Sequence, residues 1–142
     1  MDLILAKDSI DLGIVTTEPE KMLAFYRDTL GFEMKGEMPM FNGGHMYRLL
    51  CGTSMIKIVV NGKEPAAVPA PGGIEGATGY RYFTITVANL EAVVSKCSEA
   101  GYKISIPVKQ VRPGVCIAMV EDPDGNWVEF LQLGQVDAKK QH

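Results

Sequence analysis

The stretch Val120-Glu-Asp-Pro-Asp-Gly-Asn-Trp-Val-Glu-Phe-Leu-Gln132 decides the fold of this chain. Its centre, Asp122 to Asn126, is rich in turn-forming residues: Pro presets φ, Gly accepts a positive φ, and Asp and Asn hydrogen-bond the nearby backbone. Apolar runs rich in β-forming residues flank it, at Val115 to Val120 and at Trp127 to Leu131. The sequence therefore predicts a β-hairpin that turns here.

Glu129 interrupts the second of these apolar runs. Side chains alternate across a strand, so Glu129 shares one face with Trp127 and Leu131. A carboxylate buried without compensation is costly. We therefore expect Glu129 either to have a partner or to face a wet cavity.

The residues before the hairpin predict a strand, a helix and a further strand. Tyr80 to Val87 alternates as a strand, Asn89 is placed to cap a helix, Gly101 stops it, and Tyr102 to Val108 is strand-like. The apolar stripe expected on this helix consists of Leu90, Val93, Val94 and Cys97. With the hairpin, the second half reads β-α-β-β-β.

The first half has the same order of elements. Ile10 to Thr16 predicts a strand, Thr17-Glu-Pro-Glu20 matches a capping box at a helix start, and Gly31 supplies the stop. Further strands are expected at Phe32 to Gly36, His45 to Cys51 and Met55 to Val60. A shift of 71 places Glu20 over Glu91, and the agreement in element order indicates an internal duplication.

The predicted organisation is α+β: one domain over residues 1–142 that holds two tandem βαβββ modules. The modules cover residues 8–60 and 80–132, joined by a Pro- and Gly-rich connection at 61–79 that is expected to hold no regular element, and a polar tail follows at 133–142. We expect the sheets to form a cup-shaped mixed sheet with the helices on the outside.

Composition narrows the function classes. The chain has 142 residues, 46% of them hydrophobic, a formal net charge of -3 and no basic run, so no nucleic-acid partner is expected. The start of the chain lacks the positive region of a signal peptide and a run long enough to span a bilayer, which predicts a cytoplasmic protein without a membrane partner. The cysteines are expected to be small buried apolar residues: Cys51, Cys97 and Cys116.

Two segments together resemble a known superfamily. Phe25-Tyr-Arg-Asp-Thr-Leu-Gly-Phe32 at a helix end and Glu121-Asp-Pro-Asp-Gly-Asn-Trp-Val-Glu129 late in the chain are similar to the glyoxalase / bleomycin-resistance / extradiol-dioxygenase superfamily, also called vicinal oxygen chelate proteins. The resemblance covers about residues 8–132 and implies the fold described above. It leaves the activity open, because this fold hosts isomerases, epimerases, lyases, dioxygenases, thiol transferases and drug-binding proteins.

The resemblance also implies where a divalent metal would bind in this family. The family's ligand positions fall on Asp11, Lys57, Tyr82 and Glu129, and only Glu129 is the family's usual residue. An ammonium group is a poor neighbour for a metal, and Lys57 is suited to neutralising Asp11 and Glu129 instead. We therefore expect no metal and no other cofactor; the alternative is a weakly held Mg²⁺ or Mn²⁺ on Asp11 and Glu129, with Tyr82 or His45 contributing.

Strand alternation independently predicts that these four side chains face the cavity. An acid, a base, a phenol and an ammonium in one concavity suit general acid-base catalysis, so Asp11, Lys57, Tyr82 and Glu129 are the candidate catalytic residues. A buried salt bridge with a hydrogen-bonded tyrosine is the purely structural alternative. The candidate substrate-binding residues are His45, Tyr47, Thr84 and Trp127. For His45 a surface position, and for Tyr47 and Trp127 a packing role, are the alternatives.

Three functions follow from these residues. The first is a metal-independent acid/base isomerase, epimerase or lyase that acts on a small carbonyl or aromatic compound. The second is a metal-free protein that binds a drug-like molecule or confers resistance, and the third is a metal-dependent dioxygenase or glyoxalase. By resemblance, the partner of the chain is a small molecule and the assembly is a homodimer.

Overall fold

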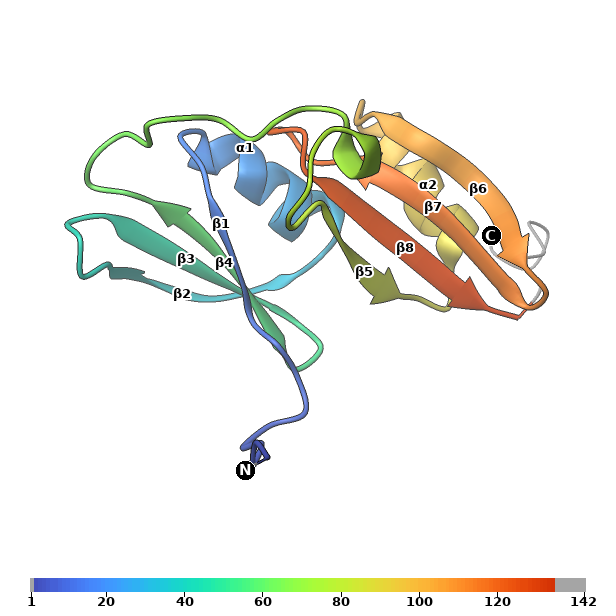
Figure 1. Cartoon of the computed structure of the whole chain (residues 1–142), viewed down its shortest axis with the longest axis horizontal. Coiled ribbons are helices and arrows are strands. Elements are labelled where there is room, and N and C mark those ends of the chain that lie inside the picture. Colours follow the sequence, from blue (N-terminus) through green and yellow to red (C-terminus); the bar gives the residue numbers. More distant parts are fainter. Residues whose placement is uncertain (1, 135–142) are drawn as a thin grey trace. The chain divides into compact units, whose positions relative to one another are not determined.

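The computed structural model describes residues 2–134 and contains two four-stranded mixed sheets (Figure 1). Their strand orders are β1-β4-β3-β2 and β5-β8-β7-β6, so the second sheet repeats the topology of the first. The chain divides into two compact units, Met1–Ala67 and Val68–His142, each of which holds one sheet. The predicted pair of βαβββ modules is confirmed by this repeat.

The first unit pairs its first and last strands in parallel. The strands are β1 (Leu12–Val15), β2 (Glu33–Pro39), β3 (His45–Cys51) and β4 (Ser54–Val60). β1 runs parallel to β4, while β2, β3 and β4 pair antiparallel in sequence. A bulge between Met34 and Gly36 shifts the register of β2. The parallel pair needs a crossover, and the helical segment between β1 and β2 supplies part of it.

That segment begins as a helix and then widens. α1 (Pro19–Leu23) continues into η1 (Ala24–Thr29), a π-helix in which the N–H of Leu30 donates to the carbonyl of Phe25 at 2.9 Å. The predicted helix stop is confirmed at Gly31, whose φ of 83° is unfavourable for a residue with a side chain.

The predicted capping box at Thr17 to Glu20 is wrong. Glu18 is the N-cap residue and makes no side-chain capping bond. Instead, the hydroxyl of Thr16 accepts the N–H of Glu18 at 2.9 Å. The hydroxyl at the end of β1 competes successfully for the backbone donor, a local preference typical of Ser and Thr.

The core of the first unit lies on the sheet face shared by Leu49, Ile56 and Ile58, all of which are buried. The helical segment contributes the buried rings of Phe25 and Tyr26, whose centroids lie 4.7 Å apart, and α1 contacts β4. Each fully buried side chain of this size stabilises the fold by roughly 1.5–3 kcal/mol. The opposite sheet face remains available to other roles.

The second unit repeats this arrangement with a regular helix. Its elements are β5 (Tyr82–Thr86), α2 (Leu90–Glu99), β6 (Ile104–Arg112), β7 (Val115–Glu121) and β8 (Trp127–Leu133). β5 runs parallel to β8, and α2 contacts β6, β7 and β8. Of the predicted helix stripe, Leu90 and Cys97 are buried, and burial raises the pKa of the Cys97 thiol to about 11. Cys116 is also buried, whereas Cys51 is half-buried.

The start of α2 is held by a distant side chain. Asn89 is the N-cap residue but makes no side-chain capping bond. The side-chain oxygen of Gln132 on β8 accepts the N–H of Leu90 at 2.8 Å. A tertiary contact thus replaces the local cap that the sequence predicts.

The predicted connection contains one short helical turn, and the last strand includes the first residue of the predicted tail. The boundary between the units, at Ala67 and Val68, falls within the predicted connection at 61–79. That segment contains one turn of 3₁₀ helix, η2 (Gly73–Glu75), so the expectation that it holds no regular element is wrong. β8 extends to Leu133, and most of the predicted polar tail, residues 135–142, lies outside the described residues. Within residues 2–134, no helix combines the length and apolar character needed to cross a membrane.

The turn between β7 and β8 is organised by one carboxylate. Asp122 is 4% exposed, and its Oδ1 accepts the backbone N–H groups of Asp124 and Asn126, each at 2.9 Å. Its Oδ2 accepts the Asn126 amide at 2.9 Å, and Gly125 adopts a φ of 86°. The predicted hairpin is confirmed.

We predict that Asp122→Ala destabilises the protein by about 1–3 kcal/mol, because two backbone donors lose their buried acceptor. Asp124→Ala is the matched control in the same turn and is expected to change stability by less than about 0.5 kcal/mol. Urea unfolding followed by fluorescence of Trp127, the single tryptophan, measures both variants. Equal effects of the two substitutions would contradict the assignment.

Candidate functional site

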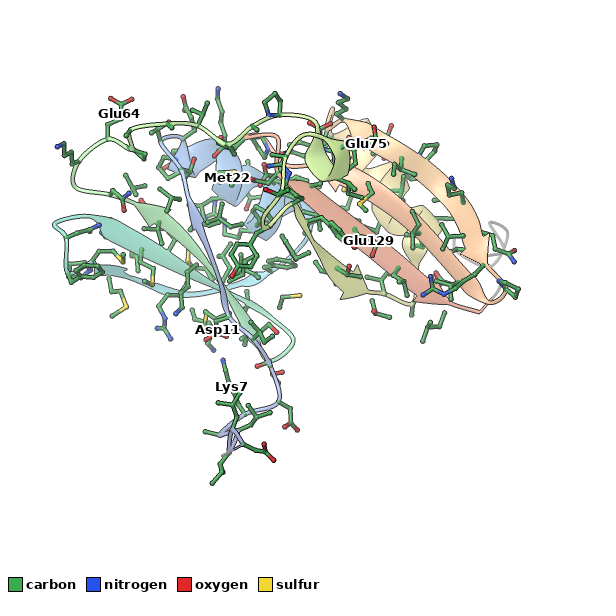
Figure 2. All side chains as sticks on the ribbon, in the orientation of Figure 1. Lys7, Asp11, Met22, Glu64, Glu75 and Glu129 are labelled. Carbon is green, nitrogen blue, oxygen red and sulfur yellow. The ribbon has the colours of Figure 1, made fainter. Side chains whose placement is uncertain are left out.

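Asp11 lies immediately before β1 and is held by two donors. Its Oδ1 accepts the Lys7 ammonium at 2.6 Å, and both residues are labelled in Figure 2. The same oxygen accepts the backbone N–H of Met55 at 2.9 Å. These bonds, followed by the positive charges of Lys7 and Lys57, hold the pKa of the Asp11 carboxyl below its usual value. Asp11 is therefore ionised at neutral pH and is a weaker base than an unperturbed carboxylate.

Lys57 stands on β4 on the same sheet face as Asp11. Its register partners are Gly13 on β1 and Arg48 on β3. The charge of Lys57 contributes to the lowered pKa of Asp11, which is consistent with their sharing this face. Lys57 is half-buried, and within residues 2–134 it forms no ion pair closer than 4 Å.

Glu129 stands at the equivalent position of the second unit. The register pairs Thr84 with Glu129, and the Thr84 hydroxyl donates to Glu129 Oε1 at 2.7 Å. One step along the same face, Tyr82 pairs with Trp127, and Tyr82 is 48% exposed. Of the two alternatives expected for Glu129, a partner or a wet cavity, the structure shows a partner. These four side chains form what we call the Glu129 group: Tyr82, Thr84, Trp127 and Glu129.

Trp127 is covered by the loop before β5, which sequence reasoning did not connect to the site. A Cβ on Gly73 would lie 2.1 Å from Cε2 of the Trp127 ring, so the loop backbone approaches the indole closely. Arg81 fixes this loop by donating to the carbonyls of Gly73 at 2.6 Å and Ala70 at 2.7 Å. The glycines of the segment were visible in the sequence, but nothing in it indicated the indole as their neighbour.

The same loop and the hairpin turn enclose a small pocket of about 120 Å³. Its polar wall includes Glu121, whose carboxylate accepts the Ser105 hydroxyl and pairs with the Lys103 ammonium at 3.3 Å. The lining residues are Pro69, Ala70, Pro71, Gly72, Gly73, Tyr80, Arg81, Glu121, Asp124, Gly125 and Asn126. The charged groups of Arg81 and Glu121 both bond to other residues of the second unit. We therefore assign these two residues a structural role in the pocket.

His45 and Tyr47 lie on the other face of their sheet. They pair with Val60 and Ile58, which places them with the core residues and opposite to Lys57. His45 Nε2 lies 2.6 Å from Glu37 Oε2, and its ring contacts Tyr47 at a centroid distance of 5.0 Å. The register therefore does not bring these two predicted substrate-binding residues to the face of Lys57.

The predicted site residues thus form two groups, one in each unit. The first unit brings Asp11 and Lys57 to one face, and the second brings together the Glu129 group. Sequence reasoning missed Arg48, the cross-strand partner of Lys57. The alternation of β3 was sufficient to find its face, but its register against β4 was required to find its neighbour.

Comparison with known proteins identifies the family. The model of the Glyoxalase/Bleomycin resistance protein/Dioxygenase superfamily matches residues 9–130. The chain belongs to this superfamily. A search of curated protein sequences finds no significant match.

Several solved structures share this fold at low sequence identity. A glyoxalase-family protein from Bacillus cereus is 15% identical with a TM-score of 0.76, over 93% of this chain and 100% of that chain. An antibiotic-binding protein from Streptomyces sp. CB03234 is 21% identical with a TM-score of 0.66, over 92% and 100%. The trypanothione-dependent glyoxalase I of Leishmania major is 16% identical with a TM-score of 0.68, over 89% and 87%. At these identities the likeness extends to the fold alone.

The residues at the superfamily's metal-ligand positions do not fit a divalent metal here. Lys57 has no free electron pair as an ammonium, and Asp11 already accepts an ammonium and a backbone N–H. Neither unit, over residues 2–134, gathers three His, Cys, Asp or Glu side chains at a metal-binding distance. The donor set therefore has the wrong chemistry for the superfamily's usual site.

We predict that Gly73→Ala moves the loop away from Trp127, because the added methyl group overlaps the indole and the backbone has a φ of 57°. The expected result is a red shift of tryptophan emission and faster acrylamide quenching. Gly79→Ala is the matched control: its φ is 101°, but a Cβ there meets nothing within 4 Å. An unchanged emission spectrum in Gly73→Ala would contradict the contact.

Proposed function

We propose that this member of the superfamily is a metal-independent acid/base enzyme, an isomerase, epimerase or lyase, acting on a small carbonyl or aromatic compound. The observation that supports it most is the bond from Thr84 to Glu129 Oε1 beside the exposed Tyr82. Thr84 orients the carboxylate, and Oε2 remains to accept a proton. A carboxylate held in this way suits proton abstraction next to a carbonyl group.

Of the two candidate carboxylates, Glu129 is better suited to act as the base. Asp11 is held by Lys7 and Met55 with a lowered pKa, which disfavours it as the base. Glu129 is therefore the proposed base. The phenol of Tyr82, which stands on the same sheet face of the second unit, stabilises the oxyanion that develops as the proton leaves. In the proposed reaction no metal or other cofactor takes part.

For any carbonyl compound that the wild-type protein converts, we predict that Glu129→Gln lowers kcat by about 10²- to 10⁴-fold, the usual contribution of a general base. Thr84→Val is expected to give a smaller loss, because the carboxylate remains but loses its donor. Glu64→Gln is the matched control, since it removes the same charge from an exposed residue of the other unit (Figure 2).

The assay is run on a panel of small carbonyl and aromatic compounds with and without EDTA. Turnover that survives EDTA and falls in Glu129→Gln supports the proposal. Turnover that EDTA abolishes, or that Glu129→Gln retains in full, would overturn it.

A second candidate is a protein that binds a drug-like molecule without changing it. The methionines on the Lys57 face favour it, because Met46 and Met55 are half-buried there and methionine adapts to irregular ligands. An antibiotic-binding protein also occurs among the structural neighbours. Recovery of a tightly bound compound in unaltered form, with no turnover of any panel member, favours this function over the enzyme.

We also propose that the protein assembles as a homodimer, as the superfamily resemblance implies. The expected result is a molar mass near 31 kDa, twice the 15.5 kDa of the chain, by light scattering after size exclusion. A mass of 15.5 kDa across the micromolar range would refute the dimer.

A further inference from the structure

Two cations stand side by side on the open face of the first unit without an ion-pair partner. The register places Arg48 directly opposite Lys57, so both side chains project from the same face. Both are half-buried, and across residues 2–134 neither forms an ion pair. Like charges in directly opposed cross-strand positions repel each other, so this arrangement costs stability unless an anion joins it.

Glycines flank the two cations on both outer strands. The register continues from Lys57 to Gly13 on β1 and from Arg48 to Gly36 on β2, so one row across the sheet reads Gly13, Lys57, Arg48, Gly36. A Cβ added at either glycine meets nothing within 4 Å. The row therefore has open space on both sides of the charged heads. In the second unit the position equivalent to Gly13 is Thr84, which fills that space and satisfies Glu129.

The other charges on this face leave the pair positive. Lys35 pairs with Glu33 at 3.3 Å and Lys7 pairs with Asp11 at 2.6 Å. The Asp11 charge also acts on Lys57, but among residues 2–134 no carboxylate forms an ion pair with Lys57 or Arg48. Above and below the row, the face carries the half-buried apolar side chains of Met46, Leu50 and Met55. The surface thus combines a pair of cations that lacks a direct ion-pair partner with an adaptable apolar border.

We propose that Arg48 and Lys57 bind the carboxylate of a small organic acid, with Gly13 and Gly36 leaving room for the acid and the methionines contacting its apolar part. The guanidinium of Arg48 matches the two oxygens of a carboxylate, and Lys57 adds a point charge. The nearby Asp11 favours a singly charged group over a dianion. This inference rests on the proposed small-molecule function and specifies its substrate or ligand as an organic acid.

The test titrates the ¹⁵N-labelled full chain with benzoate, phenyl phosphate and benzamide by NMR. Benzoate is expected to shift the amides of β3 and β4, with at least tenfold weaker binding for benzamide, which has the same ring without the charge. Tighter binding of phenyl phosphate than of benzoate replaces carboxylate by phosphate as the ligand group and overturns that part of the proposal. The absence of saturable benzoate shifts up to 20 mM overturns it entirely.

Three variants test the residues. Arg48→Gln and Lys57→Gln are each expected to weaken benzoate binding at least tenfold, whereas Lys63→Gln, which removes a charge from an exposed loop, leaves it within twofold. Gly13→Val is the sharpest variant, because β-branched residues suit strands, so it is expected to fold normally and still to weaken benzoate binding. Far-UV circular dichroism and thermal melts confirm folding, and a folded Gly13→Val with wild-type affinity contradicts the row as the binding site.

The binding test is separate from the test of catalysis. Benzoate that binds through Arg48 and Lys57 in a protein with no turnover supports the organic-acid site while the enzyme proposal fails. The reverse outcome is turnover that depends on Glu129, kcat and KM that Arg48→Gln leaves unchanged, and no binding of benzoate. That outcome supports the enzyme and overturns the organic-acid site.

Discussion

The parallel pairing of the first and last strand in each unit is the constraint on which the candidate site depends. β1 lies beside β4, and β5 beside β8, so side chains about 45 residues apart become direct neighbours. This pairing places Gly13 against Lys57 and Thr84 against Glu129. Parallel strands require a crossover, and in each unit the helix and two intervening strands make it while α1 or α2 contacts the sheet.

The two units share one topology but carry different side chains at equivalent positions of their sheets. In the second unit, Thr84 satisfies the carboxylate of Glu129 and leaves a polar, oriented group on the sheet face. In the first, Gly13 leaves Lys57 beside Arg48 with open space next to it. The same backbone therefore presents a hydrogen-bonded anion in one unit and, in the other, two cations that form no ion pair among residues 2–134. Such divergence at equivalent positions is how one fold comes to support different chemistries.

Much of the fold was predictable because its signals are local. The turn residues of Asp122 to Asn126, the alternation of the strands and the stop glycines Gly31 and Gly101 act over a few residues, and the structure places a hairpin and two helix ends there. The helix starts were less predictable. Near the start of α1 the hydroxyl of Thr16 accepts the N–H of Glu18, and at the start of α2 the side chain of Gln132 on β8 accepts the N–H of Leu90 while Asn89 makes no side-chain capping bond.

The sequence by itself determined the order of elements, the superfamily, and the strand faces on which Asp11, Lys57, Tyr82 and Glu129 lie, since alternation and turn chemistry depend only on near neighbours. Only the tertiary structure determined which side chains are in contact. Register against distant strands joined Thr84 to Glu129, set Arg48 opposite Lys57, and placed His45 and Tyr47 on the opposite face from Lys57. A single-residue change in register reverses every face, and register is fixed by packing between segments far apart in the chain.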